Sequence, residues 1–233
     1  MNPEIESKDR LIVALDLEDI EQAKALVSRL GDSVSFYKIG LQLCMTGGYF
    51  DLLGWLVEQR KKVFVDLKFF DIPATVGKAV KQLAGKGITF ATVHGNDGIM
   101  RAAAENKGDV RILAVTVLTS LDRGDLDDLG FDCDVEKLVL SRAKRAVALG
   151  CDGVVASGQE AAAMRKSLGK GFLVVSPGIR PVQNDDDQKR VVTPTEALNN
   201  GADYLVVGRP ITAATDPVAA ADNIQQEIAI ACS

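Results

Sequence analysis

The chain has 233 residues, 47% of them hydrophobic, and its 27 basic and 32 acidic side chains leave a net charge of −5. This size suits one domain around one core, and we predict that residues 1–233 form a single domain. The longest apolar runs are too short to span a bilayer, and the first ten residues lack the hydrophobic segment of a signal peptide, so we expect a cytoplasmic protein that does not act on membranes. An acidic chain with few aromatic residues is unsuited to binding nucleic acid, so we expect no nucleic-acid partner.

Short β-branched runs alternate with longer segments of helical periodicity along the whole chain, and we count eight such pairs. The predicted strands are Leu11–Asp16, Phe36–Gly40, Val63–Lys68, Phe90–His94, Ile112–Leu118, Gly153–Ala156, Phe172–Pro177 and Tyr204–Gly208. The predicted helices span about 19–31, 49–60, 75–87, 97–106, 135–149, 158–168, 194–200 and 216–231. Eight βα units in a chain of this length predict an α/β protein with the (β/α)8 TIM-barrel architecture.

A doubly wound open sheet is the main structural alternative. Against it, no G-x-G-x-x-G follows the first strand, where the chain reads ALDLEDIEQA. The irregular stretches 119–134 and 179–192 both follow predicted strands, which places them on the catalytic face of a barrel. The polar loop 181–191 is either a surface excursion or a lid over a ligand, and Gln188 is its best candidate for a ligand contact.

The densest polar feature, DLKFFDIPAT, lies at the end of the third predicted strand. Because strand side chains alternate, Asp66 and Lys68 are expected on one side, facing the barrel mouth. Asp71 follows the strand, Pro73 fixes the backbone, and Thr75 is a candidate cap for the next helix. A buried ion pair with a helix cap is the structural alternative, but an ion pair contributes little to stability after desolvation, so we favour a functional site.

Other strand ends add groups that would converge with this set. Asp16 ends the first strand, Lys38 lies in the second, and Thr119 and Ser120 follow the fifth. Asp16 and Lys38 taken singly are equally compatible with ordinary polar residues of a barrel mouth. With the charged residues of the third strand they would form a cluster of alternating sign that holds its members ionised and titrates as a unit.

The last third of the chain carries a phosphate-site pattern. Gly208 ends the eighth strand and exposes backbone N–H groups, and Arg209 can grip an oxyanion bidentately. Arg180 follows the seventh strand in SPGIRP. Barrels often bind phosphate at the loops after strands seven and eight, so we favour a phosphate site over a simple turn.

The cysteines and the single histidine give no metal-site pattern. Four cysteines without C-x-x-C spacing are interpreted as reduced packing thiols, and a Cys/His zinc site would need an unusual long-range arrangement. For His94 we favour a packing or hydrogen-bonding role over acid–base chemistry, because Lys68 already supplies a proton donor. These residues therefore give no reason to expect a Cys/His zinc site.

Seven ordered motifs make the chain resemble the orotidine 5′-phosphate decarboxylase family along its whole length. They are ALD at 14–16, YKIG at 37–40, DLKFFDIPATV at 66–76, VTVLTS at 115–120, SPGIRP at 176–181, DQKRVVTP at 187–194 and VGRP at 207–210. The resemblance implies decarboxylation of orotidine 5′-monophosphate to UMP and CO2, without metal or cofactor. One departure is Phe70, where many bacterial members have histidine, and it affects local packing rather than a chemical group.

The resemblance also implies roles for the charged residues. Lys68 would donate a proton to C6 of the pyrimidine, and Asp66 would face the substrate carboxylate. Lys38 would bridge Asp66 and the ribose, and Asp16 would bind a ribose hydroxyl. Asp71, a further catalytic position, would reach into the neighbouring subunit's site, which implies a homodimer.

Substrate contacts follow in the same way. Thr75 would reach the neighbouring site together with Asp71, and Thr119 and Ser120 would meet the base. Pro177 would wall the pocket, and Ile72 is a further substrate-binding position. The residues implied at the phosphate and its lid are Arg180, Gln188, Gly208 and Arg209.

Two alternatives to this function remain. A sugar-phosphate barrel of the hexulose-phosphate synthase type shares the Asp-x-Lys-x-x-Asp strand end but uses Mg²⁺, and DIPAT, LTS and the Gln188 loop favour the pyrimidine nucleotide instead. A non-catalytic phosphate-binding barrel is disfavoured because the charged cluster is intact. The sequence leaves open whether the protein associates with the preceding transferase of the pathway.

Overall fold

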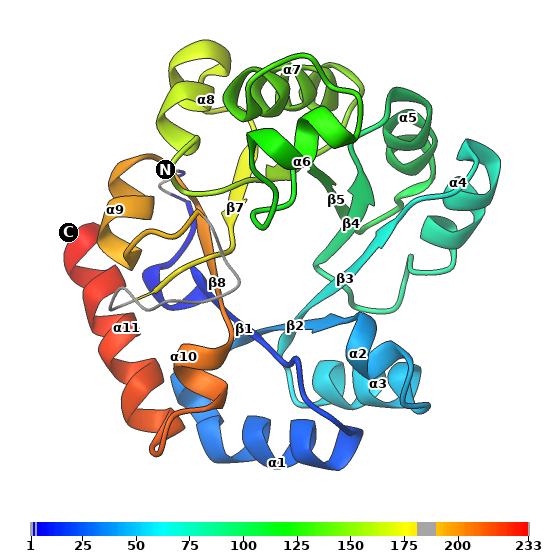
Figure 1. Cartoon of the computed structure of the whole chain (residues 1–233). Helices are drawn as coiled ribbons and strands as arrows, with labels where there is room; N and C mark the ends of the chain where they lie inside the picture. The colour runs from blue at the N-terminus through cyan, green and yellow to red at the C-terminus, as the bar shows by residue number, and fades with distance from the viewer. Residues whose placement is uncertain (1, 3, 181–189, 233) are drawn as a thin grey trace.

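A computed structural model describes residues 2, 4–180 and 190–232 of the chain. Its eight parallel strands pair in chain order, and β8 pairs with β1 to close a barrel (Figure 1). The strands are β1 (Leu11–Ala14), β2 (Phe36–Gly40), β3 (Lys62–Phe69), β4 (Phe90–His94), β5 (Arg111–Val115), β6 (Gly153–Val155), β7 (Leu173–Ser176) and β8 (Tyr204–Val207). The predicted TIM barrel is confirmed, and the open-sheet alternative is wrong.

Helices cover the outside of the barrel (Figure 1). They are α1 (Ile20–Leu30), α2 (Leu41–Cys44), α3 (Tyr49–Glu58), α4 (Pro73–Lys81), α5 (Asp97–Asn106), α6 (Arg123–Asp128), α7 (Val135–Ala148), α8 (Ala161–Leu168), α9 (Pro194–Asn199), α10 (Arg209–Thr212) and α11 (Pro217–Cys232), with 3-10 turns η1 (Ser7–Asp9) and η2 (Gly31–Ser33). The short helices α2, α6 and α10 were not predicted. α6 forms inside the stretch expected to be irregular, because Asp122 and Asp125 cap its first turn reciprocally.

Several strands are shorter at their carboxyl ends than predicted. β1 ends at Ala14 rather than Asp16, and β5 ends at Val115 rather than Leu118. Asp16 and Leu118 instead line the pocket at the mouth of the barrel. The sheet therefore ends where the chain begins to form the site.

Two apolar layers build the core. One lies between strands and helices, and the other fills the barrel interior and includes Phe36, Phe64, Phe90 and Tyr204. Phe36 and Phe90 have ring centroids 5.2 Å apart, and Phe90 and Tyr204 5.1 Å apart. Because these residues come at or near the starts of their strands, they close the amino end of the barrel. Polar groups accordingly gather at the opposite end.

A buried ion pair stabilises the amino end. Arg165 lies 2.5 Å from Asp203, with side chains 11% and 0% exposed. Asp203 precedes β8, and its backbone carbonyl accepts a hydrogen bond from Arg10 before β1. Arg10 thus ties the start of β8 to β1 where the barrel closes, and Arg165 ties α8 to the same point.

No described helix is long and apolar enough to cross a membrane. Cys151 is buried, and burial raises the pKa of its thiol to about 12, which suits the predicted packing role.

Candidate active site

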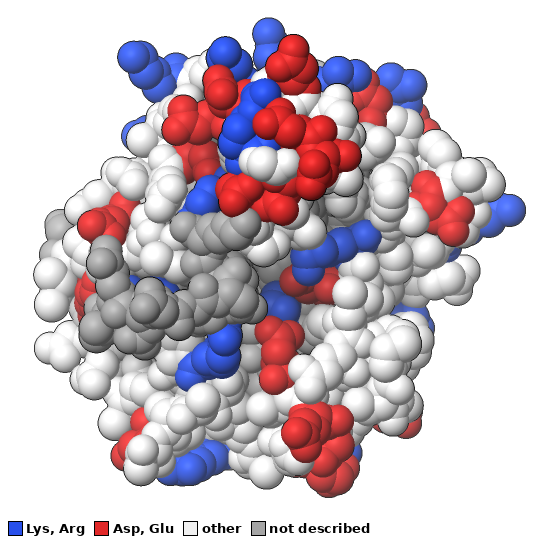
Figure 2. All heavy atoms as spheres, viewed as in Figure 1, with Lys and Arg blue, Asp and Glu red and all other residues white. Residues whose placement is uncertain are grey.

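A pocket of about 540 Å³ opens at the carboxyl ends of the strands. Acidic and basic side chains border a hollow on this face of the molecule (Figure 2). The predicted site residues that line the pocket are Asp16, Lys38, Asp66, Lys68, Thr119, Ser120, Pro177, Arg180, Gly208 and Arg209. Its volume lies within the range of small-molecule sites.

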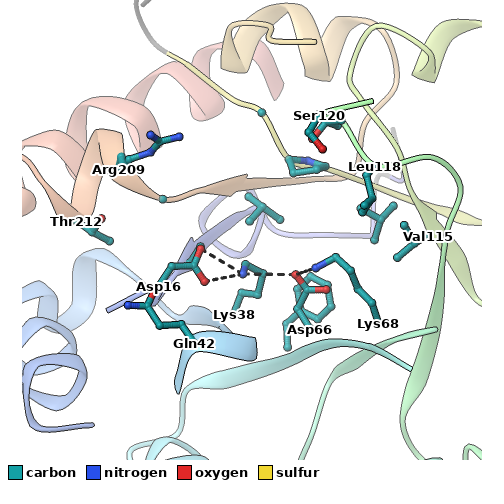
Figure 3. Close-up of a pocket in the computed structure, with 18 of the residues that line it drawn as sticks. Asp16, Lys38, Gln42, Asp66, Lys68, Val115, Leu118, Ser120, Arg209 and Thr212 are labelled. Atoms are coloured by element: carbon teal, nitrogen blue, oxygen red, sulfur yellow. Dashed lines mark hydrogen bonds and ion pairs between the residues drawn. The ribbon is translucent and has the colours of Figure 1, made fainter. Parts of the chain in front are cut away.

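Four charged side chains form a row of alternating sign across the pocket floor (Figure 3). Lys38 Nζ lies 3.1 Å from Oδ1 of Asp16 and 3.4 Å from Oδ2 of Asp66. Lys68 Nζ lies 2.9 Å from the same Asp66 oxygen. The row is therefore Asp16–Lys38–Asp66–Lys68, a cluster of alternating sign.

The barrel explains why these residues meet. Asp16 follows β1, Lys38 lies in β2, and Asp66 and Lys68 lie in β3, which are successive neighbours in the sheet. Gly40 makes the approach possible, since a Cβ atom there would lie 3.3 Å from Lys38 Nζ and 3.4 Å from Asp16 Oδ1. A small residue at the end of β2 thus leaves room for the ion pair.

Lys68 has an unusual backbone conformation. Its φ of 48° is in the left-handed region, which residues with a side chain seldom adopt. The pairing of β3 with β4 shifts register between Val65 and Phe69, around this residue. Such local irregularities redirect side chains and concentrate at functional sites. Asp66 and Lys68 do share one side, but a bulge rather than plain alternation places Lys68.

Thr92 of β4 holds this conformation and was not predicted. Its hydroxyl accepts a hydrogen bond from the backbone N–H of Lys68 at 2.9 Å and donates one to Asp66 Oδ1 at 2.9 Å. The residue is fully buried. The sequence did contain a signal for Thr92. Side chains two residues apart in a strand face the same way, so Thr92 faces the barrel interior as Phe90 does.

Ion pairing outweighs burial at the centre of the row. Burial raises the pKa of Asp66. Lys38, Lys68 and the hydrogen bond from Thr92 together lower it by more than burial raises it, so the net pKa is below its ordinary value. Burial lowers the pKa of Lys38, but Asp66 and Asp16 raise it, and the net pKa is above its ordinary value. Both groups are therefore charged at neutral pH, as predicted for a cluster of alternating sign.

Cationic and backbone groups border another part of the pocket. Arg180 follows β7 and is buried, whereas Arg209 begins α10 after β8 and is exposed. Gly208 joins β8 to α10, and a Cβ atom there would meet only Ala14 in ordinary contact at 3.7 Å. This is the arrangement predicted for an anion site. Gln42 and Thr212 also line the pocket and were not predicted (Figure 3).

Three predicted residues lie outside the pocket of this single chain. Asp71, Ile72 and Thr75 are exposed, and Asp71 Oδ1 accepts a hydrogen bond from the backbone N–H of Ile72 at 2.6 Å. The expectation that Thr75 caps the helix is wrong, because α4 begins at Pro73 and places Thr75 within the first turn. Gln188 lies outside the described residues.

His94 occupies a packing position. Its ring lies 4.6 Å from that of Phe70, the residue that departs from the family's frequent histidine. Burial and Arg142 lower the pKa of His94 below its ordinary value. The side chain does not line the described pocket. This fits the packing role favoured from the sequence.

The closed parallel barrel carries paired acids and lysines at its mouth, and arginines border another part of the same pocket. This arrangement defines a (β/α)8-barrel enzyme for a small anionic substrate. The family model described as "Orotidine 5′-phosphate decarboxylase / HUMPS family" matches residues 9–224. The chain belongs to the orotidine 5′-phosphate decarboxylase family, and it is an enzyme of the carboxy-lyase class.

Relatives similar to this chain carry the same name. The orotidine 5′-phosphate decarboxylase of Methylococcus capsulatus is 64% identical over 229 residues, covering 97% of this chain and 95% of that protein. That of Xanthomonas axonopodis pv. citri is 54% identical, covering 94% and 92%. The crystal structure of the Lactobacillus acidophilus enzyme superposes with a TM-score of 0.84 at 38% identity, covering 94% of this chain and 99% of that chain.

Proposed function

We propose that this chain converts orotidine 5′-monophosphate to UMP and CO2, the decarboxylation step of pyrimidine nucleotide synthesis. The observation that carries the proposal is the Lys68 ammonium, which is held 2.9 Å from Asp66 in a pocket that arginines border elsewhere. The names of relatives that match nearly the full chain support the same substrate.

The anionic end of the substrate fits the region after β7 and β8. Arg180 and Arg209 supply cationic donors, and Gly208 leaves the backbone open to a phosphate. Loops after the last two strands are a common phosphate site in this fold. Binding energy from this remote group can be used to align the reacting ring.

The rest of the nucleotide then lies along the charged row. Asp16 and Lys38 are placed to bind ribose hydroxyls, because Asp16 is the more exposed end of the row. The base lies between Lys68 and the wall formed by Thr119, Ser120 and Pro177. In this pose the scissile carboxylate lies beside Asp66.

The chemistry requires stabilisation of a carbanion. When the bond between C6 and the carboxyl carbon breaks, CO2 leaves and the electron pair stays on C6, where the ring delocalises it poorly. The Lys68 ammonium stabilises this charge electrostatically and then transfers a proton to C6. Asp66 holds that ammonium, and its repulsion of the substrate carboxylate is a smaller effect that ends as neutral CO2 forms.

We propose that the reaction needs no metal or other cofactor. Asp66 has little capacity for a metal, because Oδ1 accepts from Thr92 and Oδ2 is bracketed by Lys38 and Lys68. A divalent cation bound there would displace or oppose two ammonium groups. This arrangement favours the nucleotide decarboxylase over the magnesium-dependent sugar-phosphate alternative.

A homodimer would give Asp71, Ile72 and Thr75 a role that the single chain does not. Large exposed apolar side chains follow β2 and β3, which are neighbours in the barrel. They are Leu41, Met45, Phe50, Phe70 and Ile72. Apolar exposure of this kind is typical of an interaction surface. We propose that two copies pair here and that Asp71 and Thr75 enter the partner's site.

Mixing two inactive variants tests the shared site. Lys68→Ala removes the proton donor of a chain's own site, and Asp71→Ala removes the residue offered to the partner. Mixed dimers then contain one intact site, so equal mixing should restore about a quarter of wild-type activity for a two-fold dimer. No restoration after subunit exchange would place Asp71 in its own chain's site and contradict the proposal.

Loss of the orotate chromophore tests the reaction. Purified protein is mixed with orotidine 5′-monophosphate in excess chelator, with Lys68→Ala as the variant and Lys137→Ala, an exposed lysine, as the control. Turnover by wild type and the control, but not by Lys68→Ala, is expected. Turnover of a keto-sugar phosphate that depends on magnesium, with none of the nucleotide, would establish the alternative.

A further inference from the structure

Arg190 joins three parts of the barrel mouth without lining the active-site pocket. Its guanidinium donates hydrogen bonds to the backbone carbonyls of Leu118 at 2.8 Å and Val117 at 3.2 Å. It also forms a short ion pair with Glu160. The backbone carbonyl of Arg190 accepts a hydrogen bond from Ser157 at 3.3 Å. The segments after β5 and β6 are thus tied to the one before α9.

The two carbonyls belong to the wall of the active site. Val117 and Leu118 line the pocket and lead directly into Thr119 and Ser120, the residues proposed to meet the base. This segment has left the β5 ladder, which ends at Val115. Its backbone position therefore depends on contacts outside the sheet, and Arg190 supplies two of them.

The ion pair that holds Arg190 is largely buried, and removing its charges from water costs free energy. The Arg190 and Glu160 side chains are 12% and 6% exposed. They border a second cavity of about 220 Å³ between α7 and α8, together with apolar residues such as Val139 and Met164. Glu160 Oε2 and Arg190 Nε have no hydrogen-bond partner among the described residues. A pair buried with unmet hydrogen bonds is a poor source of stability, so its geometry calls for another explanation.

We propose that Arg190, held by Glu160, is a positioning residue that fixes the base-side wall of the active site through the carbonyls of Val117 and Leu118. Arg190 touches no reacting atom, and its effect is carried by the backbone of the β5–α6 segment. The inference rests on the proposed function, because it assigns the base of the nucleotide to that wall. It follows that Arg190 affects recognition of the base and not of the phosphate.

Two ligands separate these effects. UMP carries base, ribose and phosphate, whereas ribose 5-phosphate lacks the base. In Arg190→Ala the affinity for UMP should fall about tenfold, as expected for a positioning contact, while that for ribose 5-phosphate stays at its wild-type value. Titration calorimetry measures both, and kcat/KM for orotidine 5′-monophosphate should fall at least as much as the UMP affinity.

The chain offers a matched control and a variant that avoids an unpaired buried charge. Arg165→Ala breaks a similarly buried Arg–acid pair at the amino end, away from the pocket, and should lower thermal stability without changing either affinity. The double variant Arg190→Met/Glu160→Gln removes both charges and the carbonyl contacts together. It should reproduce the selective loss of UMP affinity even if Arg190→Ala does not fold.

The outcomes are distinguishable. Equal loss of UMP and ribose 5-phosphate affinity, or no loss of either in the folded double variant, would overturn the positioning role. If the variants lose UMP affinity selectively but the wild-type protein does not convert orotidine 5′-monophosphate, the positioning role is supported and the proposed reaction is wrong. Wild-type protein that binds neither ligand would defeat both proposals.

Discussion

The ammonium of Lys68 lies 2.9 Å from the carboxylate of Asp66 because the backbone of β3 turns left-handed at Lys68. In a regular strand without that turn, the Lys68 side chain would point in a different direction relative to the pocket. The conformation is held from β4, because the hydroxyl of Thr92 accepts the hydrogen bond of the Lys68 backbone N–H.

Thr92→Val should weaken the site as well as the fold. The substitution removes the donor to Asp66 and the acceptor for the Lys68 N–H, and buried groups left unpaired cost about 1–3 kcal/mol in unfolding free energy. Ser35→Ala is the control, since its hydroxyl also donates to a carboxylate, that of Asp9 at 2.8 Å, but at the amino end of the barrel and away from the pocket. Urea unfolding should show a loss of stability in both variants, larger in Thr92→Val, with kcat/KM reduced in Thr92→Val alone. Equal kcat/KM in the two variants would contradict a positioning role for Thr92.

Asp66 should make the fold sensitive to acid. Its folded pKa is below the ordinary 3.8, so the unfolded chain binds more protons in the range between the two values. Its contribution to stability is complete above pH 3.8 and is lost as pH falls through the lowered folded pKa. Urea midpoints measured from pH 6 downward should fall more steeply for wild type than for Asp66→Asn. Parallel curves would mean that the ion pairs do not favour the carboxylate.

Gly40→Ala should disturb the charged row with little effect on stability. The added methyl group meets the flexible end of Lys38 and an oxygen of Asp16, which can move apart. Misplacing Lys38 is expected to lower kcat/KM by about 10- to 100-fold. Gly54→Ala is the control, because a Cβ in the α3 interior meets nothing within 4 Å and should stabilise the fold by about 0.5–1 kcal/mol. Unchanged kinetics in Gly40→Ala would show that the row tolerates displacement.

Arg209→Ala should lower kcat as well as raise KM. Loss of a charge-assisted contact costs about 1.5–3 kcal/mol, and part of that energy is used to align the ring rather than to hold the substrate. Arg209→Lys keeps the charge but not the bidentate geometry, so its activity should be intermediate. Steady-state kinetics separates the two parameters. A rise in KM alone would mean that phosphate binding does not contribute to the chemical step.

The barrel and most residues at its mouth could be predicted, because the spacing of hydrophobic residues and the residue types at strand ends can be read from short stretches of sequence. Ten of the predicted site residues line one pocket, since parallel strands in a barrel bring their carboxyl ends together. The backbone turn at Lys68 was not predictable, because it depends on a hydroxyl from the next strand. Arg190 was missed for a similar reason, as its partners are carbonyls 72 and 73 residues away in the chain.

The two buried Arg–acid pairs lie at opposite ends of the barrel. Arg165 and Asp203 support the amino end where β8 meets β1, and Arg190 and Glu160 lie at the carboxyl end beside the pocket. We therefore expect Arg165→Ala to reduce heat resistance and Arg190→Ala to change base recognition, so that the two properties depend on opposite ends of one fold. Substitutions that adapt the protein to a new temperature can accumulate at the first end while selection on the second keeps the chemistry intact.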